Sequence, residues 1–400
     1  MRRHSLAFDA MVVWSTALLA CSGRPDLDGA ADEGCGSCHA RQADEHASSA
    51  HGSSADSPVF GALRPRVEAA WGEAARKRCD GCHTPGHTSD AHVSCVSCHD
   101  AIGNAEPRDG KLIIDLDRPP MGPFGGEGGP HGARSGALLA DSELCITCHA
   151  VTGPEHFVEP TDEEYAAFVS GGGRDSCIDC HMPTLPDGPA ASGDGLDRRL
   201  RDHTFVGLRP AWGEGAAVQS ERASDGARLL ERALSLQAER EGDLLHVRLE
   251  NLGAGHAVPT GVAALRRIWV EVRFFSDGDA VLAAHGDVDA DGRIAHAPPI
   301  ELGVFGENGE GSVDVIVDAT EVRAAVLGPG ETRDANLPIP AGAIRAVVSI
   351  RARAHTRESL DELGLEDRAA EVPTLTAATT EVDLETGEAH PDWRAPSNSP

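Results

Sequence analysis

The sequence predicts two unlike domains, a loop-rich N-terminal domain with short α-helices and an all-β, sandwich-like C-terminal domain. Three observations support this fold class. Five Cys-x-x-Cys-His units fall between residues 35 and 181. The same half is rich in Gly, Pro, Asp and Ser and lacks long apolar runs. From residue 234 onward, alternating or β-branched runs are separated by turn residues, and 400 residues are a typical length for two domains.

The five Cys-x-x-Cys-His units use ten of the eleven cysteines. This spacing attaches c-type haem: both thiols bond to the porphyrin, and the adjoining imidazole binds the iron as the proximal ligand. The predicted thioether cysteines are Cys35, Cys38, Cys79, Cys82, Cys95, Cys98, Cys145, Cys148, Cys177 and Cys180. The predicted proximal histidines are His39, His83, His99, His149 and His181. Five covalently bound haem c groups are therefore expected.

Other uses of Cys-x-x-Cys pairs explain the pattern less well. Zinc knuckles, small disulfide loops and thioredoxin-like redox sites do not require a histidine directly after the second cysteine. Histidine makes up only 19 of the 400 residues, yet it follows all five pairs. Structural zinc sites also combine two cysteine pairs per metal, which would leave one pair over.

The N-terminal domain is expected to be dominated by its haems. From Cys21 to about Pro210 there are few apolar side chains to bury, and only 4% of the whole chain is aromatic. Such a segment cannot offset its conformational entropy without the apolar faces of the porphyrins, so we expect it to be unfolded without haem. Short helices are predicted over 67–78 and 162–170, and an irregular loop over 118–130.

Residues 1–20 are typical of a secretory signal of the lipoprotein type. A basic start is followed by a short apolar run that ends in Leu18-Leu19-Ala20-Cys21, which matches a bacterial lipobox. Cleavage before Cys21 would make its thiol the site of lipidation, and Ser22 after it favours the outer membrane. The alternative is a plain cleaved signal. We expect an exported protein, in the periplasm or at the outer membrane, held by a lipid and not by a spanning helix.

The formal net charge of −29 argues against nucleic acid as a partner, because phosphates would be repelled. The same charge favours encounter with a basic redox partner through electrostatic steering. Another cytochrome or a quinol-oxidising complex would fit that description. We therefore expect redox partner proteins, and a membrane only through the lipid anchor.

The expected domains are residues 21–212 for the pentahaem cytochrome, 213–233 for a helical linker and 234–384 for the β domain, with a disordered tail at 385–400. Within the linker, a helix is predicted over 223–233. A hairpin is predicted from runs at 234–238 and 244–250, which a Gly-Asp turn separates. Further strands are predicted over 268–275, 280–285, 312–317, 333–339 and 344–352.

A six-coordinate haem needs a second axial ligand, usually His or Met. Outside the signal segment the chain has only Met121 and Met182, so histidine must supply most of these distal ligands. Thirteen histidines outside the motifs remain after cleavage of residues 1–20. Spacing alone does not say which of them bind iron.

The chain resembles the multihaem cytochromes of the cytochrome c-552/c-554 family, which are related to tetrahaem cytochrome c-554 and to hydroxylamine oxidoreductase. The resemblance covers most of the chain after Cys35. It is carried by Cys35-Gly-Ser-Cys-His-Ala-Arg-Gln42 with Ser49-Ala-His51, by His92-Val-Ser-Cys-Val-Ser-Cys-His99, by Cys177-Ile-Asp-Cys-His-Met-Pro183, by Asp202-His-Thr-Phe-Val-Gly207 and by Asn251-Leu-Gly-Ala-Gly-His-Ala-Val-Pro-Thr-Gly261. The last segment is the most specific and implies a carboxy-terminal β domain.

The resemblance implies distal ligands at His51, His131, His203 and His256. A fifth would come from His87 or His92, with His46 and His156 in reserve. Each of these histidines could instead be solvated or bonded to a loop. If His256 binds iron, the β domain takes part in the electron-transfer unit.

Two classes of function remain open. The first is an electron carrier with bis-His haems and no substrate chemistry. The second is a multihaem reductase or oxidase that acts on a small nitrogen or sulfur compound at one five-coordinate haem. The Cys-x-x-Cys-Lys unit of pentahaem nitrite reductases is missing, and Tyr165 is the sole candidate for the tyrosine cross-link of hydroxylamine oxidoreductase. Both features favour the carrier, and no catalytic residue is expected.

A weaker signal lies in Asp287-Val-Asp-Ala-Asp-Gly292, which has the opening of a calcium loop. The twelfth position of such a loop is Pro298, where a bidentate Glu is needed. We therefore do not expect calcium and interpret the acidic residues as a solvated turn.

Overall fold

A computed structural model describes residues 34–85, 92–105, 110–122, 131–152, 158–193, 197–306, 313–317 and 322–391. The described chain forms two compact units. Unit 1 takes the chain up to Ser57, Lys77–Cys148 and Ser176–Phe205, and unit 2 takes Pro58–Arg76, His149–Asp175 and the chain from Val206 onward. The boundary expected near residue 212 lies close to Val206, but two earlier segments also pack with the β-rich half.

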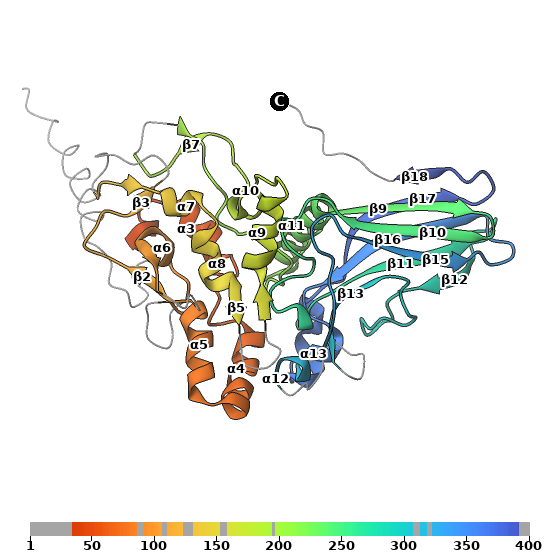
Figure 1. Cartoon of the computed structure of the whole chain (residues 1–400), viewed down its shortest axis with the longest axis horizontal. Helices are drawn as coiled ribbons and strands as arrows, with labels where there is room; N and C mark the ends of the chain where they lie inside the picture. Colours follow the sequence, from red (N-terminus) through yellow and green to blue (C-terminus); the bar gives the residue numbers. More distant parts are fainter. Residues whose placement is uncertain are drawn as a thin grey trace, which may run out of the picture. The chain divides into compact units, whose positions relative to one another are not determined.

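Unit 1 is built from short helices and very short strand pairs (Figure 1). Its helices are α3 (Ala40–Ala47), α6 (Cys95–His99), α7 (Ala137–Ala140), α8 (Glu143–His149) and α10 (Cys177–His181), and α5 (Glu73–His83) enters it from unit 2. The strand pairs are β1 (Ala101–Asn104) with β2 (Leu112–Ile114), β3 (Met121–Gly122) with β4 (Arg134–Ser135) and β7 (Gly188–Pro189) with β8 (Asp197–Arg198).

Four of the five Cys-x-x-Cys-His motifs form the last turn of a helix or a whole short helix, in α5, α6, α8 and α10. Helical residues three apart share a face, so both cysteine side chains of a motif lie on the same side. A capping box starts α10, in which the Ser176 backbone N–H donates to the Asp179 carboxylate at 2.9 Å. Ser94 and Ser97 form the equivalent box at the start of α6.

Unit 2 adds the longer helices α4 (Pro58–Trp71), α9 (Thr161–Ser170) and α11 (Ala216–Ala233). Its shorter elements are α12 (Asp314–Val317), α13 (Arg357–Glu362), the 3-10 helices η1 (Ala263–Leu265) and η2 (Glu366–Glu371), and the strand pair β5 (Ala150–Thr152) with β6 (Val158–Pro160). The N-terminal end of α13 is capped by the Thr356 hydroxyl, which accepts from the Ser359 backbone N–H.

Two antiparallel sheets make up the rest of unit 2 (Figure 1). The smaller has the order β15 (Thr332–Pro338), β10 (Leu244–Asn251), β9 (Leu234–Glu241). The larger runs through β14 (Val322–Ala325), β13 (Glu301–Gly306), β11 (Arg267–Phe275), β16 (Arg345–Arg353), β17 (Leu375–Asp383) and β18 (Ala389–Pro391), and β12 (Val281–His285) also pairs with β11.

One hydrophobic core joins the two sheets. Alternate residues Leu245, Val247 and Leu249 of β10 are fully buried, and they belong to the same cluster as Val270 and Val348 of the larger sheet. Strand β9 contacts β16 and β17 across the interior. Helix α11 packs on β17 and β9, so the segment expected to be a linker is an integral part of this core.

Several elements differ from the sequence prediction for local reasons. The helix predicted over 67–78 is divided at Gly72, whose φ of +83° ends α4 and lets α5 begin. The strand predicted over 312–317 was wrong, because residues 314–317 form α12. Val313, Ile316 and Val317 are buried, and their spacing is that of one helical face. In so short a run, β-branched residues at this spacing cannot be distinguished from a strand by sequence pattern. The hairpin predicted over 234–250 is confirmed.

The two antiparallel sheets contain four strands that the sequence did not predict, namely β13, β14, β17 and β18. Strand β18 lies in the segment expected to be a disordered tail, of which residues 392–400 are outside the described part. Within the described residues, no helix has both the length and the apolar character needed to cross a bilayer.

Candidate haem-binding sites

Three of the motif histidines have the same ring environment. The Nδ1–H of His39 donates to the Ala190 carbonyl at 2.7 Å, that of His83 to Ser54 at 2.9 Å, and that of His99 to Met121 at 2.7 Å. Donation from Nδ1 makes Nε2 the unprotonated ring nitrogen, which is the form that binds a metal. The hydrogen bond from Nδ1 to a carbonyl also fixes the orientation of the imidazole ring, as is usual for metal-bound histidine.

Two pairs of histidines combine one motif residue with one distal candidate. The ring centroids of His39 and His131 lie 6.1 Å apart, and those of His99 and His203 lie 6.4 Å apart with planes at 17°. Two imidazoles that bind opposite sides of one metal through nitrogens at about 2 Å have centroids about 6 Å apart. Both pairs therefore have the spacing that a bis-His haem requires.

The distal members of these pairs have the ring environment of the motif histidines. The Nδ1–H of His203 donates to the Arg201 carbonyl at 2.9 Å, and that of His131 donates to Gly132. Burial lowers the pKa of His203 to about 4 and also lowers the pKa of His99. The imidazoles of His99 and His203 are thus neutral at neutral pH. No proton therefore competes for the nitrogen that would bind iron.

His46 and His92 form a third pair, with ring centroids 5.8 Å apart. His46 differs from the others because its Nε2–H donates to the Val93 carbonyl at 2.8 Å, which makes Nδ1 its unprotonated nitrogen. Each motif is expected to supply one ligand to its own iron, so these two histidines, which lie outside the motifs, are not expected to share one haem. The sequence ranked His46 only as a reserve, although its position seven residues after His39 places it on the face of α3 that is buried.

The remaining candidates are placed individually. The His51 ring meets Phe205 edge-on, with centroids 4.4 Å apart. His149 ends α8 and His181 ends α10. His87, His156 and the proposed lipidation site Cys21 lie outside the described residues.

His256 lies in unit 2, in the loop between β10 and β11. Its Nδ1–H donates to the Ala257 carbonyl at 2.8 Å, which again makes Nε2 the unprotonated nitrogen. The Asn251 side chain shapes this loop: its amide donates to the carbonyls of His256 and Leu327, each at 2.9 Å, and its oxygen accepts from the Ala254 N–H. Asn251 and Leu327 thereby hold the loop to the β sheets.

Thiols of different motifs lie next to one another in unit 1. The pKa of Cys148 is raised because its thiol is hydrogen-bonded to Cys82 and buried, and the pKa of Cys145 is raised by its hydrogen bond to Cys177 and by burial. The second motif thus adjoins the fourth, and the fourth adjoins the fifth. Gly110 lies at the first of these contacts, since its N–H donates to the Thr147 carbonyl while its Cα faces Cys82.

These observations fit covalently bound haem. The four motifs in α5, α6, α8 and α10 have paired cysteines on one side of a helix, whereas Cys38 of the first motif is disulfide-bonded in this structure. The imidazole nitrogen expected to bind iron is unprotonated in His39, His83 and His99. The spacing of His131 and His203 from their partners leaves room for an iron between each pair. The donors expected to bind iron are imidazole nitrogens, which suit haem iron, whereas the thiols would bond to the porphyrin.

A comparison with solved structures gives one clear fold relationship. The chain matches the crystal structure of a penta-heme cytochrome c552 from Thermochromatium tepidum with a TM-score of 0.61. The match covers 88% of this chain and 97% of the other, at 20% sequence identity. The two proteins share a fold. No protein-family model and no curated protein matches the sequence.

The fold of that cytochrome includes both halves of this chain, because the match extends over nearly all of each protein. The β-rich half is therefore a regular part of the shared fold. This agrees with the contacts of unit 2, in which α4 and α9, from the region of the haem motifs, group with the β sheets. The likeness shows the fold, and the roles of individual histidines rest on their own geometry.

Two carboxylates of the acidic turn at 287–292 are engaged by neighbouring groups. The Asp289 carboxylate accepts from the backbone N–H groups of Asp291 and Arg293, each at 2.9 Å. Asp287 pairs with His296 at 2.7 Å. Across the described residues, no group of three or more His, Cys, Asp or Glu side chains is arranged to hold a metal ion.

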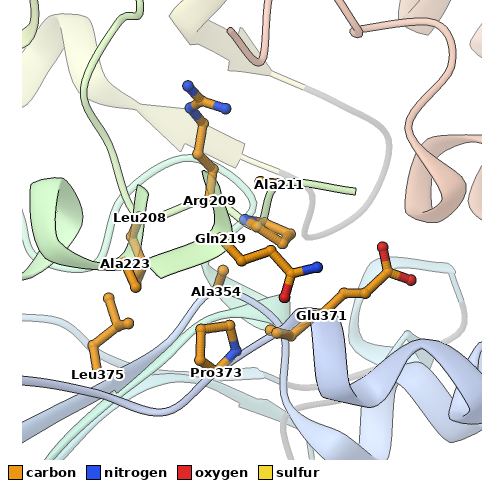
Figure 2. Close-up of a pocket in the computed structure, with 11 residues that line it drawn as sticks. Leu208, Arg209, Ala211, Gln219, Ala223, Ala354, Glu371, Pro373 and Leu375 are labelled. Atoms are coloured by element: carbon orange, nitrogen blue, oxygen red, sulfur yellow. The ribbon is translucent and has the colours of Figure 1, made fainter. Parts of the chain in front are cut away.

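A small pocket in unit 2 has no catalytic character. Its cavity volume is about 10 Å³, and it is lined by Leu208, Arg209, Pro210, Ala211, Gln219, Ala223, Ala354, Glu371, Val372, Pro373 and Leu375. Figure 2 shows Arg209 directed away from the other lining side chains, with Gln219 and Glu371 together on one side. Glu371 is already paired with Arg368 at 2.6 Å. The volume is below the 300–1,000 Å³ typical of ligand pockets.

Proposed function

We propose that this protein is a pentahaem c-type cytochrome that relays electrons through haems with two histidine ligands. The observation that carries the proposal is the pairing of His39 with His131 and of His99 with His203 at 6.1 and 6.4 Å. The shared fold with a pentahaem cytochrome supports it. When bound, each haem supplies an iron that alternates between the ferric and ferrous states.

The residues of the chain hold and tune these irons. Backbone carbonyls of Ala190, Ser54 and Met121 keep the Nδ1 protons of the proximal histidines in place and raise the basicity of the ligating nitrogens. The imidazole of His203, which burial keeps neutral, would complete the coordination of one haem and exclude water from its iron. The adjoining thiols of the second, fourth and fifth motifs place neighbouring attachment sites close together, as transfer between haems requires.

Electron paramagnetic resonance of the oxidised holoprotein tests this function. Five low-spin ferric signals are expected, with no change on addition of nitrite, hydroxylamine or sulfite. A high-spin signal that shifts with one of these compounds would instead identify a five-coordinate, catalytic haem and overturn the carrier function. Haem content by the pyridine haemochrome method should be five per chain.

The export part of the proposal places the protein in the periplasm or at the outer membrane, anchored through lipid on Cys21. The lipobox that ends in Cys21 supports it. Replacement Cys21→Ser should release the holoprotein from membranes into the soluble fraction and abolish labelling by a radioactive fatty acid. Retention of the label in this variant would contradict the anchor. A basic redox protein remains the proposed partner, because the chain carries a formal charge of −29.

A further inference from the structure

Within unit 2, helix α9 contacts the residues on either side of His256 in the chain, Gly255 and Ala257. The Glu164 carboxylate accepts from the backbone N–H of Ala257 at 2.9 Å, one residue after His256. On the other side, the Phe168 ring packs against Gly255, where a Cβ would come within 3.0 Å of the ring. Both side chains come from the same face of α9, since they are four residues apart.

A third contact joins α9 to the same loop. The Thr161 hydroxyl lies 3.0 Å from the Thr260 hydroxyl, and Thr260 is also hydrogen-bonded to Glu164. Glu164 is half-buried, and burial raises the pKa of its carboxyl despite these hydrogen bonds. A half-buried carboxylate that accepts from a backbone N–H is unfavourable to remove, because the N–H then loses its partner.

These contacts act on the orientation of the His256 ring. The ring donates from Nδ1 to the Ala257 carbonyl, and Glu164 holds the N–H of the same residue. Gly255 permits the close approach of Phe168, which blocks movement of the loop toward α9. Rotation of either peptide next to His256 would therefore break a hydrogen bond or collide with an aromatic ring.

We propose that Glu164 and Phe168 are positioning residues that set the direction of His256 Nε2 as the distal ligand of one haem. The inference rests on the proposed function, because it requires that His256 binds iron. It explains why a helix from the region of the haem motifs packs with the β-rich half. Neither residue touches the iron, so their effect is transmitted through the backbone of the loop.

The test compares electron paramagnetic resonance spectra and reduction potentials of variant holoproteins. In Glu164→Ala, one of the five low-spin signals should be lost or shifted, and that signal should be the one removed by His256→Ala. In Glu164→Gln the same low-spin signal should be retained, because the glutamine amide oxygen still accepts a hydrogen bond from the Ala257 N–H. Glu163→Ala is the matched control: this exposed neighbour on α9 carries the same charge, and its removal should leave all five signals unchanged.

Two further variants separate positioning from general destabilisation. Phe168→Ala and Thr260→Val should shift the same signal as Glu164→Ala, each by a smaller amount, and leave the other four unchanged. Uniform broadening of all five signals, or an unshifted spectrum in Glu164→Ala, would overturn the positioning role. If His256→Ala itself leaves five low-spin signals, the ligand assignment fails, whatever Glu164 does. The failure of the inference can thus be told apart from failure of the proposed function.

Discussion

The imidazole rings of His99 and His203 lie 6.4 Å apart with their planes only 17° from parallel. They come from segments separated by more than one hundred residues, one in the third haem motif and one in the segment that ends unit 1. Each ring donates its Nδ1 proton to a backbone carbonyl, so each has an unprotonated Nε2. The fold of unit 1 thus places two imidazoles at the spacing that both axial ligands of one low-spin haem would require.

Replacement of His203 should open the haem of the third motif. In His203→Ala, one iron of five is expected to change from low-spin to high-spin, because no second imidazole remains opposite His99. Electron paramagnetic resonance and the charge-transfer band of ferric high-spin haem near the red end of the visible spectrum provide the measurement. His296→Ala, which changes an exposed histidine in a turn, is the control and should keep five low-spin irons. A wholly low-spin His203→Ala protein would show that another ligand serves this haem.

Gly110 should tolerate no side chain at the contact between the second and fourth motifs. A Cβ there would lie 2.6 Å from the Cys82 sulfur and 2.7 Å from the Gly81 backbone, and φ is +72°. Gly110→Ala is expected to lower the free energy of unfolding by about 1–2 kcal/mol for the backbone conformation. Overpacking should cost about 1–3 kcal/mol more and reduce the haem content.

Gly193→Ala separates the two costs. Its φ is +80°, and nothing lies within 4 Å of the added Cβ, so only the backbone term should appear. Urea unfolding and the pyridine haemochrome assay compare both variants with the parent holoprotein. Equal losses in the two variants would show that the Cys82 contact is relaxed in solution.

Removal of haem should affect the two units differently. Among the described residues, the buried hydrophobic side chains of unit 1 are Val96, Ala101, Met121, Ile146 and Leu200. Unit 2 instead has a continuous core that runs through both sheets. Protein made without haem attachment should therefore keep a strand-type circular dichroism signal and a cooperative transition, whereas limited proteolysis should digest the segments of unit 1. Full protection of both units without haem would contradict this prediction.

His355 should make unit 2 sensitive to acid. Its ring stacks on Trp212 with centroids 5.7 Å apart, and its Nδ1 is buried without a hydrogen-bond partner. Burial, together with the charges of Arg266 and Arg353, lowers the pKa of His355 to about 3. The unfolded chain takes up a proton below pH 6.5 and the folded one does not, so stability should fall by about 1.4 kcal/mol per pH unit from pH 6.5 toward 3.

The variant His355→Phe isolates this contribution. A phenyl ring can still stack on Trp212 but cannot be protonated, so the variant should lose less stability than the parent protein between pH 6.5 and 4.5. The measurement is urea unfolding of the holoprotein at both pH values, followed by the circular dichroism of the strands. The same pH dependence in both proteins would show that His355 is not the titrating group.

The haem-attachment motifs could be recognised in the sequence because the chemistry they imply is local. Cys145, Cys148 and His149 lie within five residues, and one turn of helix brings them together whatever the rest of the fold does. The hairpin at 234–250 was predictable for the same reason, since turn and alternation are both short-range signals. The error at 312–317 arose where four residues are too few to separate helical from strand spacing.

Partners distant along the chain were decided only in three dimensions. The sequence nominated His131 and His203 by resemblance, but it could not say that they face His39 and His99, nor that His46 lies beside His92. It also gave no sign that α9 would hold the loop of His256, because Glu164 and Ala257 are ninety-three residues apart. Covalent attachment depends on neighbours in the chain, whereas the opposite side of an iron depends on which loops pack together. The sequence alone therefore predicted where haem would be attached, and the tertiary structure decided that His131 and His203 lie near His39 and His99.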